Sequence, residues 1–137
     1  MEESSDKRES TSAVKYEYEL STDEGLRLKV RQQLKYLNFS WFDPNGERLS
    51  VGWMTSRNVQ DFLSAISDLK SEGRGVYEMG GWGGDEVARL VLRQKIPQKV
   101  EIITNYPTRF TANVNTEEID KFQSYLEGKL FSLSEGE

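Results

Sequence analysis

The side chains that most often perform chemistry are missing from this chain of 137 residues, which has no Cys and no His. Ser-His and Cys-His nucleophile pairs are therefore excluded, as are thiolate chemistry, disulfides and most structural zinc sites. Carboxylate-only or Lys-based catalysis stays open, but the sequence has no signature for either. We expect a binding protein rather than an enzyme, with no cofactor and no metal.

Two groups of carboxylates are the remaining candidates for a metal site or an acid–base pair. The first is Asp85 with Glu86, and the second is Glu117, Glu118 and Asp120. The second group falls in the first turn of an expected helix, where negative charge complements the helix dipole. The first group fits a solvated loop. We therefore expect neither group to be catalytic.

A glycine-rich segment, Gly80-Gly-Trp-Gly-Gly84, presents one large aromatic side chain, Trp82. An exposed Trp in a loop makes a good anchor for a protein partner, and the neighbouring Asp85 and Glu86 would complement a basic surface. The alternative is that Trp82 folds back to cap the core. The segment has neither the P-loop Lys-Ser/Thr nor the G-x-G-x-x-G pattern, so we expect no nucleotide there.

A stripe of cations is the second candidate site. Its members alternate with apolar residues, and two aromatics of outward parity flank them; the set is Arg27, Lys29, Arg31, Tyr36, Phe42, Arg89 and Arg93. Outward cations beside rings can follow a phosphate backbone while bases stack on the rings. The alternative is cross-strand pairing, because Glu17 and Glu19 belong to the outer face of the adjacent expected strand.

The elements that position these residues occur twice. Strand-like alternation is followed by a helix-like stripe in residues 14–72 and again in 73–133. A repeat of this length is a supersecondary unit that buries its face against its copy. In the first repeat, Leu37, Phe39 and Trp41 form one inner face, and Leu49, Val51 and Trp53 form the next. We therefore expect Trp41 and Trp53 to lie in the core.

The predicted fold is α+β, a tandem β-β-β-β-α repeat whose antiparallel sheets are each covered by one helix. We expect a single domain over 14–133, with disordered tails at 1–13 and 134–137. The net charge of −5 disfavours broad electrostatic binding to nucleic acid. With no apolar run long enough to span a bilayer and no apolar signal segment, we expect a cytoplasmic location and no membrane partner.

Two resemblances add to this pattern. The tandem β4α build over residues 14–131 resembles the PUR and Whirly folds, which implies binding of single-stranded DNA or RNA. The run FLSAISDLKSEGRGVYEMGGWGGDEVARLVLRQK, residues 62–95, is similar to a pattern in bacterial toxin-immunity-like proteins, in which a helix leads into a Gly- and Trp-containing segment and then strands. That similarity implies an inhibitor of a protein partner.

Three functions follow as hypotheses. The first is a non-enzymatic immunity- or inhibitor-type protein that occludes a protein partner with a basic surface, through Trp82, Asp85 and Glu86. The second is single-stranded nucleic-acid binding by the outer sheet face. The third is a structural or assembly role, because the edges of a sheet invite pairing with another chain.

Overall fold

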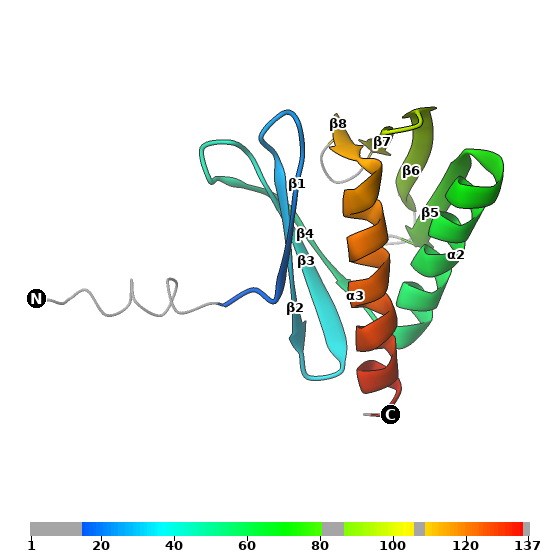
Figure 1. Cartoon of the computed structure of the whole chain (residues 1–137). Helices are drawn as coiled ribbons and strands as arrows, with labels where there is room; N and C mark the ends of the chain where they lie inside the picture. The colour runs from blue at the N-terminus through cyan, green and yellow to red at the C-terminus, as the bar shows by residue number, and fades with distance from the viewer. Residues whose placement is uncertain (1–14, 81–86, 106–108, 136–137) are drawn as a thin grey trace, which may run out of the picture.

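A computed structural model of the chain describes residues 15–80, 87–105 and 109–135. It has two four-stranded antiparallel sheets, each followed by a helix, so the predicted α+β tandem repeat is confirmed (Figure 1). The first repeat comprises β1 (Tyr18–Ser21), β2 (Arg27–Gln33), β3 (Tyr36–Phe42), β4 (Arg48–Met54) and α2 (Ser56–Glu72). The second comprises β5 (Arg74–Gly80), β6 (Val87–Ile96), β7 (Lys99–Thr104), β8 (Phe110–Asn115) and α3 (Thr116–Glu135). Strands in both sheets follow chain order, as in a meander.

Alternation of side chains gives each strand of the first sheet one buried face. Leu28 and Val30 of β2 point into the core, while Arg27, Lys29 and Arg31 point to the opposite, outer face. Leu37, Phe39 and Trp41 of β3 are all buried, as expected. The tight turn at residues 43–46 is held by Asp43, whose Oδ1 accepts from the backbone N–H groups of residues 45 and 47 at 2.9 Å.

The predicted inner face of β4 is wrong at two positions. Trp41 pairs with Ser50 and Phe42 with Arg48, so Leu49 is an extra residue in a β-bulge. One inserted residue exchanges the two faces of the strand beyond it. Val51 and Trp53 therefore lie on the outer face, each 42% exposed, and only Trp41 of the two tryptophans is in the core.

The expected alternation at the start of β1 also breaks. Tyr18 and Leu20 face the core, but the chain bends at Glu17. Tyr16 consequently lies against Phe42, which has outward parity, with ring centroids 6.2 Å apart. Glu17 turns the other way, toward α3, where its Oε1 accepts from the Tyr125 hydroxyl at 2.8 Å.

Helix α2 has clear start and stop signals. Thr55 is the N-cap, and it forms a capping box with Asn58 in which each side chain accepts from the other residue's backbone N–H. Gly73, with φ of +83°, ends the helix in the left-handed conformation that glycine adopts without strain. Helical spacing predicts a stripe of Val59, Phe62, Leu63, Ile66 and Leu69; all are buried except Leu63, which is half-buried, and Ala65 is buried as well.

Helix α3 contacts both sheets, whereas α2 packs mainly on β5 and β6 of the second sheet and against α3. In Figure 1, α3 runs beside the first sheet, where Lys129 donates to Gln32 of β2, and α2 lies beside β5. Phe122 of α3 joins the layers, because its ring contacts Tyr18 and Phe39 of the first sheet and Phe62 of α2 at centroid distances of 5.3, 6.1 and 5.8 Å. Phe62 in turn contacts Tyr77 of β5 at 5.4 Å. One core therefore serves both repeats.

The contact of α2 with the second sheet is unusually close at Gly75. A Cβ atom at this position would lie 1.8 Å from the carbonyl oxygen of Ala65. Only glycine fits between the strand and the helix backbone here. Neither helix is long and apolar enough to cross a membrane within the described part of the chain.

Polar contacts also join the repeats. The amide N–H of Asp23 donates to the Asn113 carbonyl at 2.8 Å, and Glu24 accepts from the backbone and side chain of Asn113 at 2.8 and 2.6 Å. Partial burial raises the pKa of the Glu24 carboxyl, but its hydrogen bonds with Asn113 outweigh burial and hold the pKa below 4.5. The β1–β2 hairpin is thereby fixed to β8.

Candidate nucleic-acid interface

The outer face of the first sheet presents its side chains in rows fixed by strand register. One row runs Glu19–Lys29–Ser40–Val51 across the four strands. The next contains Arg31, Asn38 and Trp53, and the row beyond the bulge contains Arg27, Phe42 and Arg48. The set that we call the outer face of the first sheet is Tyr16, Glu19, Arg27, Lys29, Arg31, Tyr36, Asn38, Ser40, Phe42, Arg48, Val51 and Trp53.

Aromatic rings lie at both ends of this face. Trp53 is 42% exposed and Tyr36 is 39% exposed, and they occupy diagonal positions on β4 and β3. Phe42 and Tyr16 form an edge-to-face pair at the other end. The outward positions predicted for Tyr36 and Phe42 are confirmed.

Cations lie between the rings. The Lys29 ammonium is 5.1 Å from the centroid of the Phe42 ring and 5.8 Å from that of Tyr16, which places it within cation–π range. The Nε of Arg31 is buried and has no hydrogen-bond partner within the described ranges. No carboxylate in those ranges forms an ion pair with Lys29 or Arg31. Arg27 has one, a 3.6 Å contact with the half-exposed Glu19.

A small polar pair occupies the centre of the face. Ser40 donates to the Asn38 Oδ1 at 3.2 Å, and the Asn38 amide lies 3.4 Å from the Gly52 carbonyl. Both side chains are buried although they have outward parity, since the longer side chains around them close over the short ones. Because the short side chains in the middle are buried, the rings and cations around them are the groups that a ligand can reach on this face.

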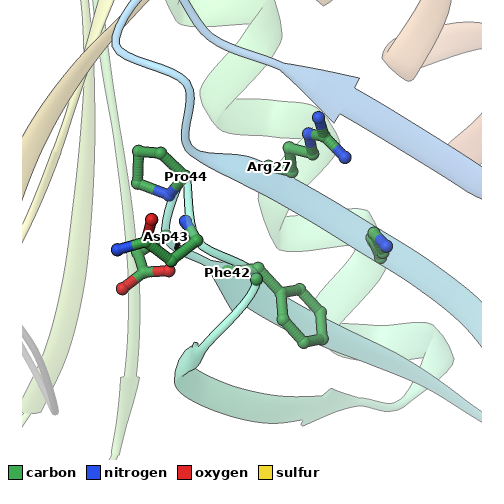
Figure 2. A pocket seen from close by; sticks show the side chains of 7 residues that line it. Arg27, Phe42, Asp43 and Pro44 are labelled. Atoms are coloured by element: carbon green, nitrogen blue, oxygen red, sulfur yellow. Dashed lines mark hydrogen bonds between the residues drawn. The ribbon is translucent and has the colours of Figure 1, made fainter.

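A shallow pocket of about 270 Å³ opens at the end of the face where β2 begins. Figure 2 shows Arg27 on β2 on one side and the turn carrying Asp43 and Pro44 on the other, with Phe42 below them and its ring directed away from the turn. Lys29, Asn45 and Gly46 complete the lining. The Oδ1 atom of Asp43 accepts the two backbone hydrogen bonds of the turn, while two cations and a ring supply the groups that can hold a ligand. This combination suits a phosphate with an aromatic group attached.

The second half of the predicted cation stripe is not part of this face. Arg89 and Arg93 lie on β6 of the other sheet, where each is neutralised by a carboxylate. Arg89 pairs with Glu78 at 2.7 Å, and Arg93 with Glu101 at 2.7 Å. The alternative interpretation, that carboxylates on neighbouring strands neutralise these cations, therefore holds for β6. On β2 it holds only for Arg27, because Glu17 instead forms an ion pair with Lys129 on α3, 2.8 Å away.

Among the charged and aromatic members of the outer face, sequence reasoning missed three: Tyr16, Arg48 and Trp53. The alternation of side chains along the strand could have placed Arg48 on the outer face, and in the structure it pairs with the outward Phe42. The other two depend on a bend and a bulge that alternation alone does not reveal. A Trp in an apolar-looking strand is more often core, which is why Trp53 was misplaced.

The other predicted sites have different outcomes. Trp82, Asp85 and Glu86 lie outside the described residues, so the protein-occlusion site stays a prediction. Glu117 and Glu118 lie in the first turn of α3, and Asp120 forms a 2.6 Å ion pair with Lys70. No group of three or more acidic side chains that could hold a metal ion occurs in the part of the chain that the structure describes.

No protein-family model, curated protein or solved structure matches this chain. The function is therefore argued from the residues themselves.

Proposed function

We propose that this protein binds single-stranded DNA or RNA on the outer face of the first sheet and is not an enzyme. One observation carries the proposal: two cations without a carboxylate partner in the described ranges, Lys29 and Arg31, lie between aromatic rings on one open sheet. The tandem β4α build that resembles PUR and Whirly proteins points to the same ligand.

The physical argument starts from the rings. Every base has a π-face, so exposed rings such as Trp53 and Tyr36 stack on bases of any sequence. A duplex hides those faces, whereas a single strand offers them. Rings on an open sheet therefore favour single strands, and we expect little sequence preference because the face has few groups that would read base edges.

The cations of β2 supply the second part of the physical argument. Arg27, Lys29 and Arg31 stand on alternate positions of one strand, so their head groups follow a line along the sheet. Phosphate oxygens accept charge-assisted hydrogen bonds from such groups, and neither Lys29 nor Arg31 has a carboxylate partner in the described ranges to compete with a phosphate. The pocket between Arg27 and Phe42 provides room for a phosphate at the end of this line.

The net charge of −5 limits the affinity without excluding the site. Many carboxylates lie elsewhere, for example Glu117 and Glu118 on α3. With about three phosphate contacts, the affinity should fall with salt with a slope of about −2 on logarithmic axes, from roughly −0.7 per contact for a single strand. We expect micromolar binding at low salt.

Fluorescence anisotropy with labelled oligo-dT and oligo-U, at about 50 and 200 mM salt, tests the proposal. Trp53→Ala should weaken binding by about 1–3 kcal/mol, the cost of one lost stacking contact. Arg31→Gln should weaken binding and flatten the salt dependence. Arg93→Gln is the matched control, since this arginine is bound to Glu101 on the other sheet and should leave binding unchanged.

Two results would overturn the proposal: no binding of either oligonucleotide at low salt, or equal losses for Arg31→Gln and Arg93→Gln. The first would leave occlusion of a protein partner as the working hypothesis, to be pursued by comparing affinity capture with and without Trp82→Ala. The second would show that the measured binding is diffuse electrostatic attraction with no defined face.

A further inference from the structure

The free edge of β4 is the feature that the proposed function leaves unexplained. Each sheet has two edge strands, which are β1 and β4 in the first and β5 and β8 in the second. An edge strand presents backbone N–H and C=O groups that can pair with another strand, and proteins usually protect such edges. The four edges differ in how far they are protected.

Three of the edges have an identifiable protection. β8 is held by the β1–β2 hairpin through the hydrogen bonds between Asn113 and residues 23 and 24. β1 is only four residues long, and Glu17 beside it is bound by α3. β5 carries two charged side chains, Arg74 and Glu78, and packs against α2. Charges and short lengths are common means of discouraging edge pairing.

Among the described residues, the protections of β4 are its bulge and a single charge, Arg48, at its first position. From Ser50 to Met54 it contains no charge and no Pro, and two apolar side chains, Val51 and Trp53, are 42% exposed. Residues 50–53 make no backbone hydrogen bond to any described strand other than β3. The bulge lies at Leu49, so the segment beyond it is regular strand. Such an edge is suited to accept another strand.

We propose that β4 pairs in antiparallel fashion with β4 of a second copy of this chain. A second copy supplies an identical uncharged strand, and an antiparallel arrangement about a two-fold axis satisfies both edges at once. Arg48, the one charge of β4, lies at the end of the strand, so no like charges face each other near the axis. The exposed apolar area of Val51 and Trp53 then lies beside that of the partner copy and loses contact with water.

The antiparallel pairing determines how the outer faces of the two molecules are oriented relative to each other. A two-fold axis between antiparallel strands of one sheet is perpendicular to the sheet, so the outer faces of both copies point the same way. The two four-stranded sheets become one sheet of eight strands. This inference does not rest on the proposed function, because it uses the backbone edge of β4 and is measured without nucleic acid.

Sedimentation velocity between about 1 μM and 1 mM protein tests the pairing. We expect the mass to rise with concentration from 15.8 kDa toward twice that value and no further, since a two-fold contact is closed. Val51→Lys places one ammonium group on each of the two paired edges and should move the midpoint to at least about tenfold higher concentration. Ile96→Lys, the same kind of change at an exposed apolar side chain on β6, should leave the midpoint unchanged.

Hydrogen exchange locates the contact in the wild-type protein. Outward amides within residues 50–54 should gain protection at high concentration, while those of β5 should not. A chain that stays at 15.8 kDa throughout overturns the proposal. So does a dimer that Val51→Lys leaves intact, or one whose gain in protection lies outside β4. An open-ended increase in mass would equally contradict a closed β4–β4 pair.

Discussion

Phe122 of α3 stacks on Tyr18 of β1 with ring centroids 5.3 Å apart, so the helix of the second repeat covers the sheet of the first. The same ring reaches Phe39 and, on α2, Phe62. One side chain therefore contacts three of the packed elements, and its removal tests whether the two repeats share one core.

Phe122→Ala should lower the free energy of unfolding by about 3–5 kcal/mol, because it removes a buried ring and leaves a cavity among three others. Denaturant titration followed by circular dichroism measures this. Phe131→Ala is the matched control on the same helix. Its ring is 70% exposed, so its loss should change stability by no more than about 0.5 kcal/mol. Equal effects of the two substitutions would mean that α3 does not pack as described.

Gly75 and Gly128 should respond to alanine with opposite signs. At Gly75 the new Cβ would meet the Ala65 carbonyl, so Gly75→Ala should destabilise by about 1–3 kcal/mol as strand and helix are pushed apart. At Gly128, within α3, a Cβ meets nothing within 4 Å, and Gly128→Ala should stabilise by about 0.5–1 kcal/mol. Thermal unfolding of both variants checks the pair. A stabilising Gly75→Ala would contradict the close contact of β5 with α2.

The Glu17 carboxylate should make the free energy of unfolding depend on pH in the acidic range. Partial burial raises its pKa, but hydrogen bonds from Lys129 and Tyr125 outweigh burial and hold the pKa below 4.5. A carboxyl whose pKa is lowered on folding stabilises the protein above its unfolded pKa and loses that contribution as pH falls through the lowered value.

Glu17→Gln should therefore be less stable than the wild type near pH 7, and the difference should shrink below about pH 4. The side chain is partly exposed, so we expect a difference of no more than about 1 kcal/mol. Denaturant titrations across the pH range measure it. Glu47→Gln, in an exposed turn, should follow the wild-type profile. A difference for Glu17→Gln that grows on acidification would contradict the assigned contacts.

Leu34 is the one non-glycine residue of the described ranges with positive φ, at 58°, and it is almost fully exposed. A left-handed conformation costs a side-chain-bearing residue about 1–2 kcal/mol. Leu34→Gly should remove this strain and, after the entropy cost of glycine, stabilise by about 0.5–1 kcal/mol. Ile96→Gly, at an exposed position at the end of β6 without positive φ, should destabilise. Calorimetry that finds the same sign for both variants would contradict the turn geometry.

Regular alternation and helical spacing were sufficient to predict the strands, the buried stripe of α2 and the outward cations of β2. These patterns depend on local geometry, which repeats along the chain. Trp53 was misplaced because a single bulge at Leu49 exchanges the faces of β4, and a bulge depends on pairing with β3. Arg89 and Arg93 were grouped with Arg27 because the sequence shows the same cation pattern twice. The carboxylates that neutralise them, Glu78 and Glu101, could be identified only from the register of the neighbouring strands.

The packing of α3 on the first sheet and of α2 on the second could likewise not be predicted from the sequence. Both helices have one apolar stripe, and either stripe could cover either sheet. The choice is made by long-range contacts such as the hydrogen bond between Tyr125 and Glu17, which joins residues 108 positions apart.

That separation has a consequence during synthesis. A ribosome makes the chain from the N-terminus, so the first sheet is complete while α3, which covers it, is still untranslated. Until α3 emerges, the inner faces of Tyr18, Leu28 and Phe39 have no helix of their own to cover them. We therefore expect the nascent first half to be the stage at which this protein exposes the most apolar surface, and a pause in translation near α2 would prolong that exposure.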